Sequence, residues 1–338
     1  MEVTPPHRRV PVTEPSQPSA ARFAAQEAAE AAGFEQEDVY RAGLVATELA
    51  TNLVKHAAGG GEMLVRPVRS ARPAEVEIIA IDRGRGMVDV ARSLADGHST
   101  SGTSGNGLGA VQRLSDEFDI YSQPGRGTVV LTRLRRDRTT RKEPHRLEFA
   151  GVSIPMAGET VCGDSWQVHH HADGAFAFVA DGLGHGLQAG EASTAAIGAV
   201  DTRKKADVAI FLEDMHFGLR HTRGAAAAIA EILPGRGTMK FAGVGNISGA
   251  ICRPGTTRHA VSLNGTLGHQ AREFREYTYP WEPDAVLVMH SDGLGSRWSL
   301  DDYPGLRLRH PGVIAAVLYR DFTRQRDDIT VVIGREAA

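Results

Sequence analysis

The sequence predicts an α+β protein with two domains, and three observations support this. The chain has 338 residues, which is more than one ordinary domain needs. Residues 133–146, RLRRDRTTRKEPHR, are dense in charge and contain no core-forming residue after Leu134. Helical and strand patterns alternate before this stretch, whereas short strands around intervening helices dominate after it. We therefore expect a first domain at 1–137, a charged linker at 138–146 and a second domain at 147–338. The charged stretch is either a solvated linker or a docking surface for an acidic partner.

Composition indicates a globular protein of the cytoplasm. Hydrophobic residues make up 41% and charged residues 23%, and the formal net charge of −3 gives no general attraction to nucleic acid or to a membrane. Two cysteines, Cys162 and Cys252, are too few for a disulfide framework and fit a reducing cytosol. The proline-rich start lacks the apolar segment of a secretion signal, and no run of about 18 apolar residues could span a membrane.

Periodic patterns place the main elements along the chain. In the first domain we expect three helices, at 19–34, 38–61 and 108–118, and two strands, at 75–82 and 127–134. In the second domain we expect four strands, at 175–181, 238–245, 285–292 and 329–334, and two alanine-rich helices, near 187–200 and 205–220. The second domain therefore reads as a layered arrangement of strands and helices.

Two polar residues stand out on the second expected helix. Glu48 and Asn52 lie four residues apart, so their side chains share one face. A carboxylate can accept the proton of an attacking hydroxyl, and an amide oxygen can ligate Mg²⁺, which usually brings phosphates with it. A wet helix face would give the same pair, but the neighbours Leu44, Leu49 and Leu53 are apolar and no helix end explains the two polar residues.

Glycines recur where a nucleotide would need a close approach to the backbone. Asp82 ends a strand before Gly84 and Gly86; its carboxylate can accept a hydrogen bond from an exocyclic amine, and the glycines leave room for a flat base. The segment 93–114 holds glycines ahead of a helix, whose N-terminus can bind phosphate: Gly102, Gly105, Gly107 and Gly109. Thr128 then offers a hydroxyl at the start of the last strand. Each piece alone also fits a turn or a flexible loop.

The order of these motifs resembles the GHKL ATPase superfamily over about residues 8–134. ATELATNLVKHA and LADGHSTSGTSGNGLGAVQRLSDEFDI resemble, in particular, the RsbT-type switch kinases of bacterial stress signalling. The resemblance implies a Bergerat-type α/β sandwich that binds ATP and Mg²⁺ and phosphorylates a protein serine. It implies that Glu48 is the base for the acceptor serine, that Asn52 ligates Mg²⁺ and that Asp82 reads adenine. The other implied ATP contacts are Lys55, Gly84, Gly86, Gly105, Gly107, Gly109 and Thr128.

The second domain repeats an acidic residue beside glycine at strand ends. DGLG occurs twice, 111 positions apart, and places Asp181 and Asp292 after strands, while CGDSW contains Asp164. Asp327 and Asp328 directly precede the last strand. A strand that ends in aspartate and turns on glycine presents a carboxylate at one edge, and sites made only of oxygen ligands suit Mg²⁺ or Mn²⁺ rather than zinc. A single pair of this kind is usually a β-turn, but four in this order indicate a binuclear site for phosphoester hydrolysis.

The segment 147–336 resembles the PPM phosphatases, specifically their compact SpoIIE and RsbX branch. The matching stretches are GxxxxGD at 158–164, DGLGHG, FAGVGNISG, SDGLGSRW and DDITVVI. The resemblance implies a compact α-β-β-α sandwich that binds two Mn²⁺ or Mg²⁺ ions. It implies that Asp181 bridges both ions and that Gly182 lends its carbonyl, with Asp164, Asp292 and Asp327 completing the shells. Asp327 is preferred to Asp328, an alignment uncertain by one residue.

Several other polar residues attract attention near these motifs. Asn246 and His185 fall near the site in the family pattern, and we assign both to turn stabilisation. The triplet 169–171 is all histidine, but it precedes Ala-Asp-Gly, a hairpin signal, so we expect no metal there. Cys162 is expected to be a buried core residue, since no partner base is evident. No arginine for binding the substrate phosphate is evident from the sequence.

Three functions follow from these observations. The leading one is a bifunctional regulator of a partner-switching pathway, which phosphorylates a serine on a STAS-type antagonist or stressosome-like scaffold and also removes such a phosphate. In the second, the first domain binds ATP and a partner such as a sigma factor without phosphorylating it. In the third, it is a nucleotide sensor attached to a phosphatase; a downstream phosphatase is a further candidate partner. Glu48 favours the first function, because a pure binder needs no carboxylate at the base position.

Overall fold

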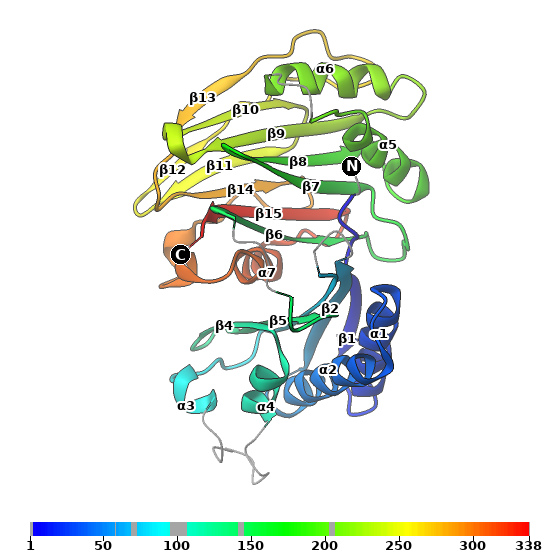
Figure 1. Cartoon of the computed structure of the whole chain (residues 1–338), viewed down its shortest axis with the longest axis vertical. Coiled ribbons are helices and arrows are strands. Elements are labelled where there is room, and N and C mark those ends of the chain that lie inside the picture. The colour runs from blue at the N-terminus through cyan, green and yellow to red at the C-terminus, as the bar shows by residue number, and fades with distance from the viewer. Residues whose placement is uncertain are drawn as a thin grey trace. The chain divides into compact units, whose positions relative to one another are not determined.

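Figure 1 shows the computed structural model of the chain; the structure describes residues 3–57, 59–68, 73–94, 107–140, 145–202 and 207–337. The chain folds into two compact units. The first is His7–Glu143, and the second combines Met1–Pro6 with Pro144–Ala338. Among the described residues, none of the helices is long and apolar enough to cross a membrane.

The first unit is an α/β sandwich of two layers. Its antiparallel sheet has five strands in the order β1-β2-β3-β5-β4. The strands are β1 (Arg8–Val12), β2 (Gly61–Val68), β3 (Glu75–Asp82), β4 (Glu117–Gln123) and β5 (Gly127–Arg135). The helices are α1 (Pro18–Ala31), α2 (Gln36–His56), α3 (Val90–Leu94) and α4 (Gly107–Leu114). Apolar side chains of α1, α2 and α4 share one core with the sheet, so these helices cover a single face of it (Figure 1).

Small residues and one buried arginine fix the position of α2. The buried side chains of α1 are all alanine: Ala21, Ala24, Ala25, Ala28 and Ala29. Gly43 of α2 faces α1 so closely that a Cβ there would lie 3.0 Å from Gln26 Nε2. Arg41 Nη1 lies 3.0 Å from Asp116 Oδ2, and its Nη2 donates to Arg135 O at 2.8 Å. These contacts hold the helix that carries Glu48 and Asn52 against the sheet.

A buried ion network lies on the sheet face opposite the core helices. Strand pairing places Arg66 and Arg133 on either side of Glu77, and each guanidinium Nη2 lies 2.7 Å from a Glu77 carboxylate oxygen. His7 Nε2 lies 3.0 Å from Glu77 Oε1. All four side chains are buried. Burial alone would raise the pKa of Glu77, but the two guanidinium charges and the His7 contact outweigh it and hold that pKa well below its usual value.

We predict that Glu77→Gln destabilises the first unit by about 3–5 kcal/mol at pH 7, because two arginines lose their buried counter-charge. A depressed carboxyl pKa stabilises the fold above the pKa of the unfolded chain, about 4.3, and that gain declines below it. The difference between wild type and variant should therefore narrow below about pH 4. Calorimetric unfolding of the full chain measures this. Glu27→Gln is the control, since Glu27 pairs with Arg8 at the surface, and an equal loss in both variants would contradict the argument.

The second unit is an α-β-β-α sandwich (Figure 1). One sheet has the order β13-β10-β9-β8-β7 and the other β12-β11-β14-β15-β6. The strands are β6 (Leu147–Ile154), β7 (Asp164–His171), β8 (Gly174–Gly182), β9 (Ala225–Leu233), β10 (Thr238–Val244), β11 (Ser248–Arg253), β12 (Thr256–His259), β13 (Tyr277–Pro280), β14 (Val286–His290) and β15 (Ile329–Glu336). The helices are α5 (Leu187–Gly198), α6 (Val208–Gly218) and α7 (Pro311–Phe322), with short 3₁₀ helices at Pro234–Arg236, Leu300–Asp302 and Leu306–Leu308. An apolar core fills the space between the sheets, α5 and α6 cover the first sheet, and α7 covers the second.

The expected fold class is confirmed for both halves. Two of the elements that were not predicted, α7 and β9, were missed because they are almost completely buried. α7 was not predicted because residues 311–320 are all buried, which leaves no polar stripe to reveal a helical period. β9, AAAAIAEIL, is rich in alanine and buried on both faces, so it lacks the alternation of a half-exposed strand. The histidine triplet lies at the end of β7, and β8 follows after the predicted hairpin turn.

The first residues of the chain belong to the second unit. Thr4 N donates to Trp166 O at 3.1 Å, beside the edge strand β7, and Val3 packs against the core under α5 and α6. The sequence had placed these residues in a first domain at 1–137. The first unit is therefore covalently continuous with the second at both of its ends.

Candidate functional site

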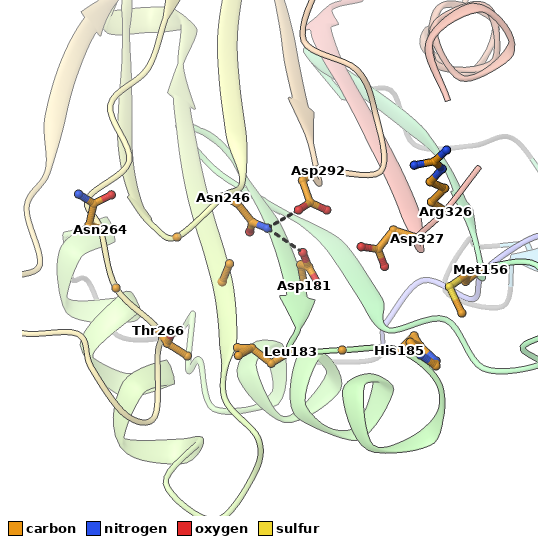
Figure 2. Close-up of a pocket in the computed structure, with 14 residues that line it drawn as sticks. Met156, Asp181, Leu183, His185, Asn246, Asn264, Thr266, Asp292, Arg326 and Asp327 are labelled. Carbon is orange, nitrogen blue, oxygen red and sulfur yellow. Dashed lines mark hydrogen bonds between the residues drawn. The ribbon is translucent and has the colours of Figure 1, made fainter. Parts of the chain in front are cut away.

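The acidic residues of the second unit come together where strands of its two sheets end. Asp164 begins β7 and pairs with Asp181 near the end of β8 in one sheet. Asp292 follows β14, and Asp327 precedes β15, in the other sheet. Figure 2 shows Asp181, Asp292 and Asp327 pointing toward one another. Residues up to 163 positions apart thus meet because the two sheets stack face to face.

A cavity of about 490 Å³ opens at this cluster. Three of the carboxylates line it together with glycines, polar side chains, three apolar residues and one arginine: Met156, Asp181, Leu183, Gly184, His185, Ala226, Gly245, Asn246, Asn264, Gly265, Thr266, Asp292, Arg326 and Asp327. Its size suits a small polar group such as a phosphorylated side chain.

Asn246 bridges two of the carboxylates. Its Nδ2 donates to Asp292 Oδ2 at 2.9 Å and to Asp181 Oδ2 at 3.4 Å (Figure 2). His185 Nδ1 lies 2.7 Å from Glu159 Oε1. The assignment of both residues to turn stabilisation was wrong for their side chains, because these contacts join segments far apart in the sequence.

Asp164 lies buried behind Asp181. Its Oδ2 accepts a hydrogen bond from Ser291 Oγ at 2.6 Å, and Ser291 Oγ in turn accepts from Thr330 N at 2.9 Å. Within the described part of the chain, Asp164 Oδ1 has no hydrogen-bond partner although it is buried. An unpartnered buried carboxylate oxygen is costly unless a cation faces it.

Burial and mutual repulsion raise the proton affinity of the cluster. Burial, followed by the charges of Asp292 and Asp327, raises the pKa of Asp181 to about 7. Burial and the neighbouring Asp181 raise the pKa of Asp164 well above its usual value, and burial also raises the pKa of Asp327. Divalent cations would relieve this repulsion, and a donor set made only of oxygens fits Mg²⁺ or Mn²⁺.

Gly182 follows Asp181 at a position where only glycine fits. A Cβ at this position would lie 2.0 Å from Ala189 O, so only glycine allows α5 to approach the end of β8. Its N–H donates to Gly163 O at 3.1 Å, which ties the Asp181 loop to the Asp164 loop. That its carbonyl serves as a ligand stays a prediction.

The two adjacent aspartates before β15 occupy different surroundings. Asp327 is exposed and lines the cavity. Asp328 is buried, its Oδ1 accepts from Met156 N at 2.9 Å, and its Oδ2 lies against Gly163, where a Cβ would come within 2.5 Å. This geometry favours Asp327 as the ligand and Asp328 as a residue that positions the surrounding loops.

We predict that Asp327→Ala and Asp328→Ala separate these roles. Without added metal, Asp328→Ala should lower stability by about 1–3 kcal/mol, because the half-buried Met156 amide loses its acceptor, while Asp327→Ala should not. With Mn²⁺, Asp327→Ala should lose most of the metal-induced rise in melting temperature. Thermal unfolding of the full chain with and without Mn²⁺ measures both effects. A larger loss of the Mn²⁺ effect in Asp328→Ala would reverse the assignment.

In the first unit, Glu48 and Asn52 meet the start of α4. A Cβ on Gly107 would lie 3.1 Å from Glu48 Oε2 and 3.6 Å from Asn52 Oδ1. Two motifs that are 55 residues apart therefore face each other, and a larger side chain at Gly107 would crowd both polar groups. Gly109 is buried two residues further along α4.

Asp82 and Thr128 lie side by side at the ends of β3 and β5. Gly127 has a φ of +83°, and a Cβ there would lie 2.1 Å from Asp82 O. Asp82 Oδ1 accepts from Gly84 N at 2.6 Å. Thr128 Oγ1 lies 2.9 Å from the hydroxyl oxygen of Ser122, a residue that the sequence did not single out.

The remaining predicted ATP contacts are placed only in part. Gly86 has a φ of +66° and packs against Gln123 O, where a Cβ would come within 2.2 Å. Lys55 is exposed at the end of α2. The pKa of the neighbouring His56 is lowered by burial and then by the charges of Arg85 and Lys55. Gly105 falls in 95–106, outside the described residues, so the predicted phosphate loop is not located.

Each of the two units resembles a different family of known proteins. A model of the histidine kinase-like ATPase domain matches residues 12–133. The serine/threonine-protein kinase RsbT of Bacillus subtilis (strain 168) is 38% identical over 111 residues, covering 33% of this chain and 83% of RsbT. The chain belongs to the RsbT family of histidine kinase-like ATPases, and it carries a SpoIIE-type PPM domain as well.

The SpoIIE-type domain has its own relatives. The family model of stage II sporulation protein E (SpoIIE) matches residues 171–335. The phosphoserine phosphatase RsbX of Bacillus subtilis (strain 168) is 26% identical over 197 residues, covering 57% of this chain and 97% of RsbX. A chain solved in work on the bacterial stressosome as a modular system that controls secondary messenger signalling aligns with a TM-score of 0.51 and 25% identity, covering 56% of this chain and 100% of that one.

Proposed function

We propose that the second unit is a metal-dependent phosphatase for phosphoserine or phosphothreonine in proteins. The observation that carries this proposal is the cavity in which Asp181, Asp292 and Asp327 converge with Asp164 behind them. Two Mn²⁺ or Mg²⁺ ions bound there would polarise the phosphoryl group and activate water for its attack. The similarity to RsbX and SpoIIE supports the same reaction.

The chain's own residues would organise this reaction. Asp181, Asp164, Asp292 and Asp327 would hold the ions, with Asp181 shared between them. The Asn246 amide orients the Asp181 and Asp292 carboxylates through its two hydrogen bonds. The hydrogen bond from Ser291 already orients the Asp164 carboxylate, so a cation that binds to its other oxygen needs no further loss of rotamer freedom.

The first unit, in the same proposal, is an ATP-dependent serine kinase. Glu48 would accept the proton of the acceptor serine, and Asn52 would hold Mg²⁺ at the phosphates. Asp82 would accept a hydrogen bond from the adenine amine, with Thr128 beside it. The contact of Gly107 with Glu48 and Asn52 supports this, because it places a helix N-terminus, which favours phosphate, beside the base and the metal ligand. Lys55, Gly84, Gly86, Gly105 and Gly109 remain proposed ATP contacts.

The partner would be a STAS-type antagonist or stressosome-like scaffold in a cytoplasmic partner-switching pathway. The similarity to RsbT and to a stressosome chain supports this class of partner. A kinase and a phosphatase on one chain would meet the same bound substrate, because covalent linkage raises the effective concentration of each site to about millimolar. The alternative is a first unit that binds ATP and a partner, or senses nucleotide, without phosphate transfer.

We predict that the full chain with ATP and Mg²⁺ holds a STAS substrate at partial phosphorylation. Asp181→Ala should raise the phosphorylated fraction, since hydrolysis stops, and Glu48→Ala should bring it toward zero, since transfer stops. Intact mass spectrometry of the substrate measures the fraction. Glu37→Ala, an exposed change on the same helix, is the control. Unchanged transfer in Glu48→Ala would contradict the role of Glu48 as the base, whereas no transfer by the wild type would leave the ATP-binding alternative. An unchanged fraction in Asp181→Ala would mean that the two units serve different substrates.

A further inference from the structure

The charge of the cluster leaves the substrate phosphate without a counter-charge. Four carboxylates converge at or behind the cavity: Asp164, Asp181, Asp292 and Asp327. Two divalent ions carry four positive charges, so ions and carboxylates together are close to neutral. A phosphate monoester is a dianion near neutral pH. A cationic side chain from the protein would therefore strengthen binding in a site of low dielectric.

The described residues that line the cavity include a single arginine and no lysine. That arginine is Arg326, next to Asp327. His185 also lines the cavity, but its ring is engaged by Glu159 at 2.7 Å. Arg326 is exposed, and no ion pair joins it to any other described residue. Figure 2 shows its side chain extending beside Asp327 with the guanidinium directed away from Asp181.

The backbone around Arg326 is fixed against the cluster. Gln325 has a φ of +58° and is the only described residue other than glycine with a left-handed backbone. Arg324 N donates to Gly293 O at 2.9 Å, and Gly295 N donates to Phe322 O at 2.8 Å. These bonds join the loop before β15 to the turn after Asp292. Sparsely populated backbone conformations persist only where the surroundings impose them, and they concentrate at functional sites.

A second arginine approaches the cavity without lining it. Arg223 Nη1 would lie 3.0 Å from a Cβ on Gly184, which is a cavity residue. Arg223 precedes β9, on the side of the cavity formed by the Gly182–Gly184 turn, because Leu183 N donates to Gly224 O at 3.0 Å. It is the natural competitor for the role of phosphate ligand.

We propose that Arg326 swings into the cavity and holds the phosphoryl oxygens of the substrate through two of its guanidinium N–H groups. The inference rests on the proposed phosphatase function. Arginine presents donors in a planar fork that matches two phosphate oxygens, whereas lysine offers a single point charge. The fixed backbone supplies the position. The exposed side chain, which has no ion pair with another described residue, is free to reach phosphate once cations occupy the carboxylates.

The test compares four variants of the full chain loaded with Mn²⁺: Arg326→Ala, Arg326→Lys, Arg324→Ala and Arg223→Ala. The first readout is the rise in melting temperature caused by inorganic phosphate, which requires no turnover. The second is KM and kcat for a phosphoserine peptide. We expect Arg326→Ala to weaken phosphate binding and to raise KM by about 10- to 100-fold, the range for a lost charge-assisted hydrogen bond. Arg326→Lys should recover part of the binding.

The controls separate this role from damage to the metal site. Arg324 carries the same charge two residues away in the same loop and does not line the cavity, so Arg324→Ala should match wild type. The Mn²⁺-induced rise in melting temperature should be unchanged in Arg326→Ala. Normal phosphate binding by Arg326→Ala, or a larger loss in Arg223→Ala, would overturn the proposal. If wild type binds phosphate yet hydrolyses no phosphopeptide, the proposed function fails while the assignment of Arg326 stands.

Discussion

Mutual repulsion among the carboxylates of Asp181, Asp292 and Asp327 is the constraint around which the second unit is built. Burial and neighbouring charge raise the pKa of Asp181 to about 7, so the fold holds these groups together against an electrostatic cost. The apolar core between the two stacked sheets offsets that cost, because it fixes the strand ends from which the carboxylates project. Hydrogen bonds from Asn246 and Ser291 then orient the oxygens. The same arrangement that is unfavourable for the bare protein is favourable for divalent cations.

The first unit also contains clustered polar groups, and it satisfies their charges in a different way. Its sheet carries a buried carboxylate, Glu77, whose charge is matched within the protein by Arg66 and Arg133, so no ligand is required there. Around Glu48 and Asn52, by contrast, the close approach of Gly107 leaves polar groups facing a helix N-terminus. One network is satisfied internally and stabilises the fold. In the proposed function the other would present its polar groups to a nucleotide.

Much of the fold and several candidate site residues could be predicted from the sequence, because the motifs that indicate them are short and continuous. The order of motifs placed Glu48, Asn52 and Asp82 on the correct elements, and the aspartates beside glycine marked strand ends correctly. What was missed depends on contacts between distant segments. The bridge from Asn246 to two carboxylates and the place of Arg326 in the cavity arise only when the two sheets stack. Fully buried elements such as α7 were missed because they show no amphipathic period.

In the proposed function, the second unit binds two divalent ions through one set of carboxylates. Isothermal titration of the full chain with Mn²⁺ tests it most directly, with Asp181→Ala and the surface variant Asp173→Ala in parallel. We expect two ions to bind to wild type and to Asp173→Ala, and we expect the binding of both ions to be impaired in Asp181→Ala, because a shared ligand serves both. Titration of wild type to a single ion, or two ions of undiminished affinity in Asp181→Ala, would contradict it.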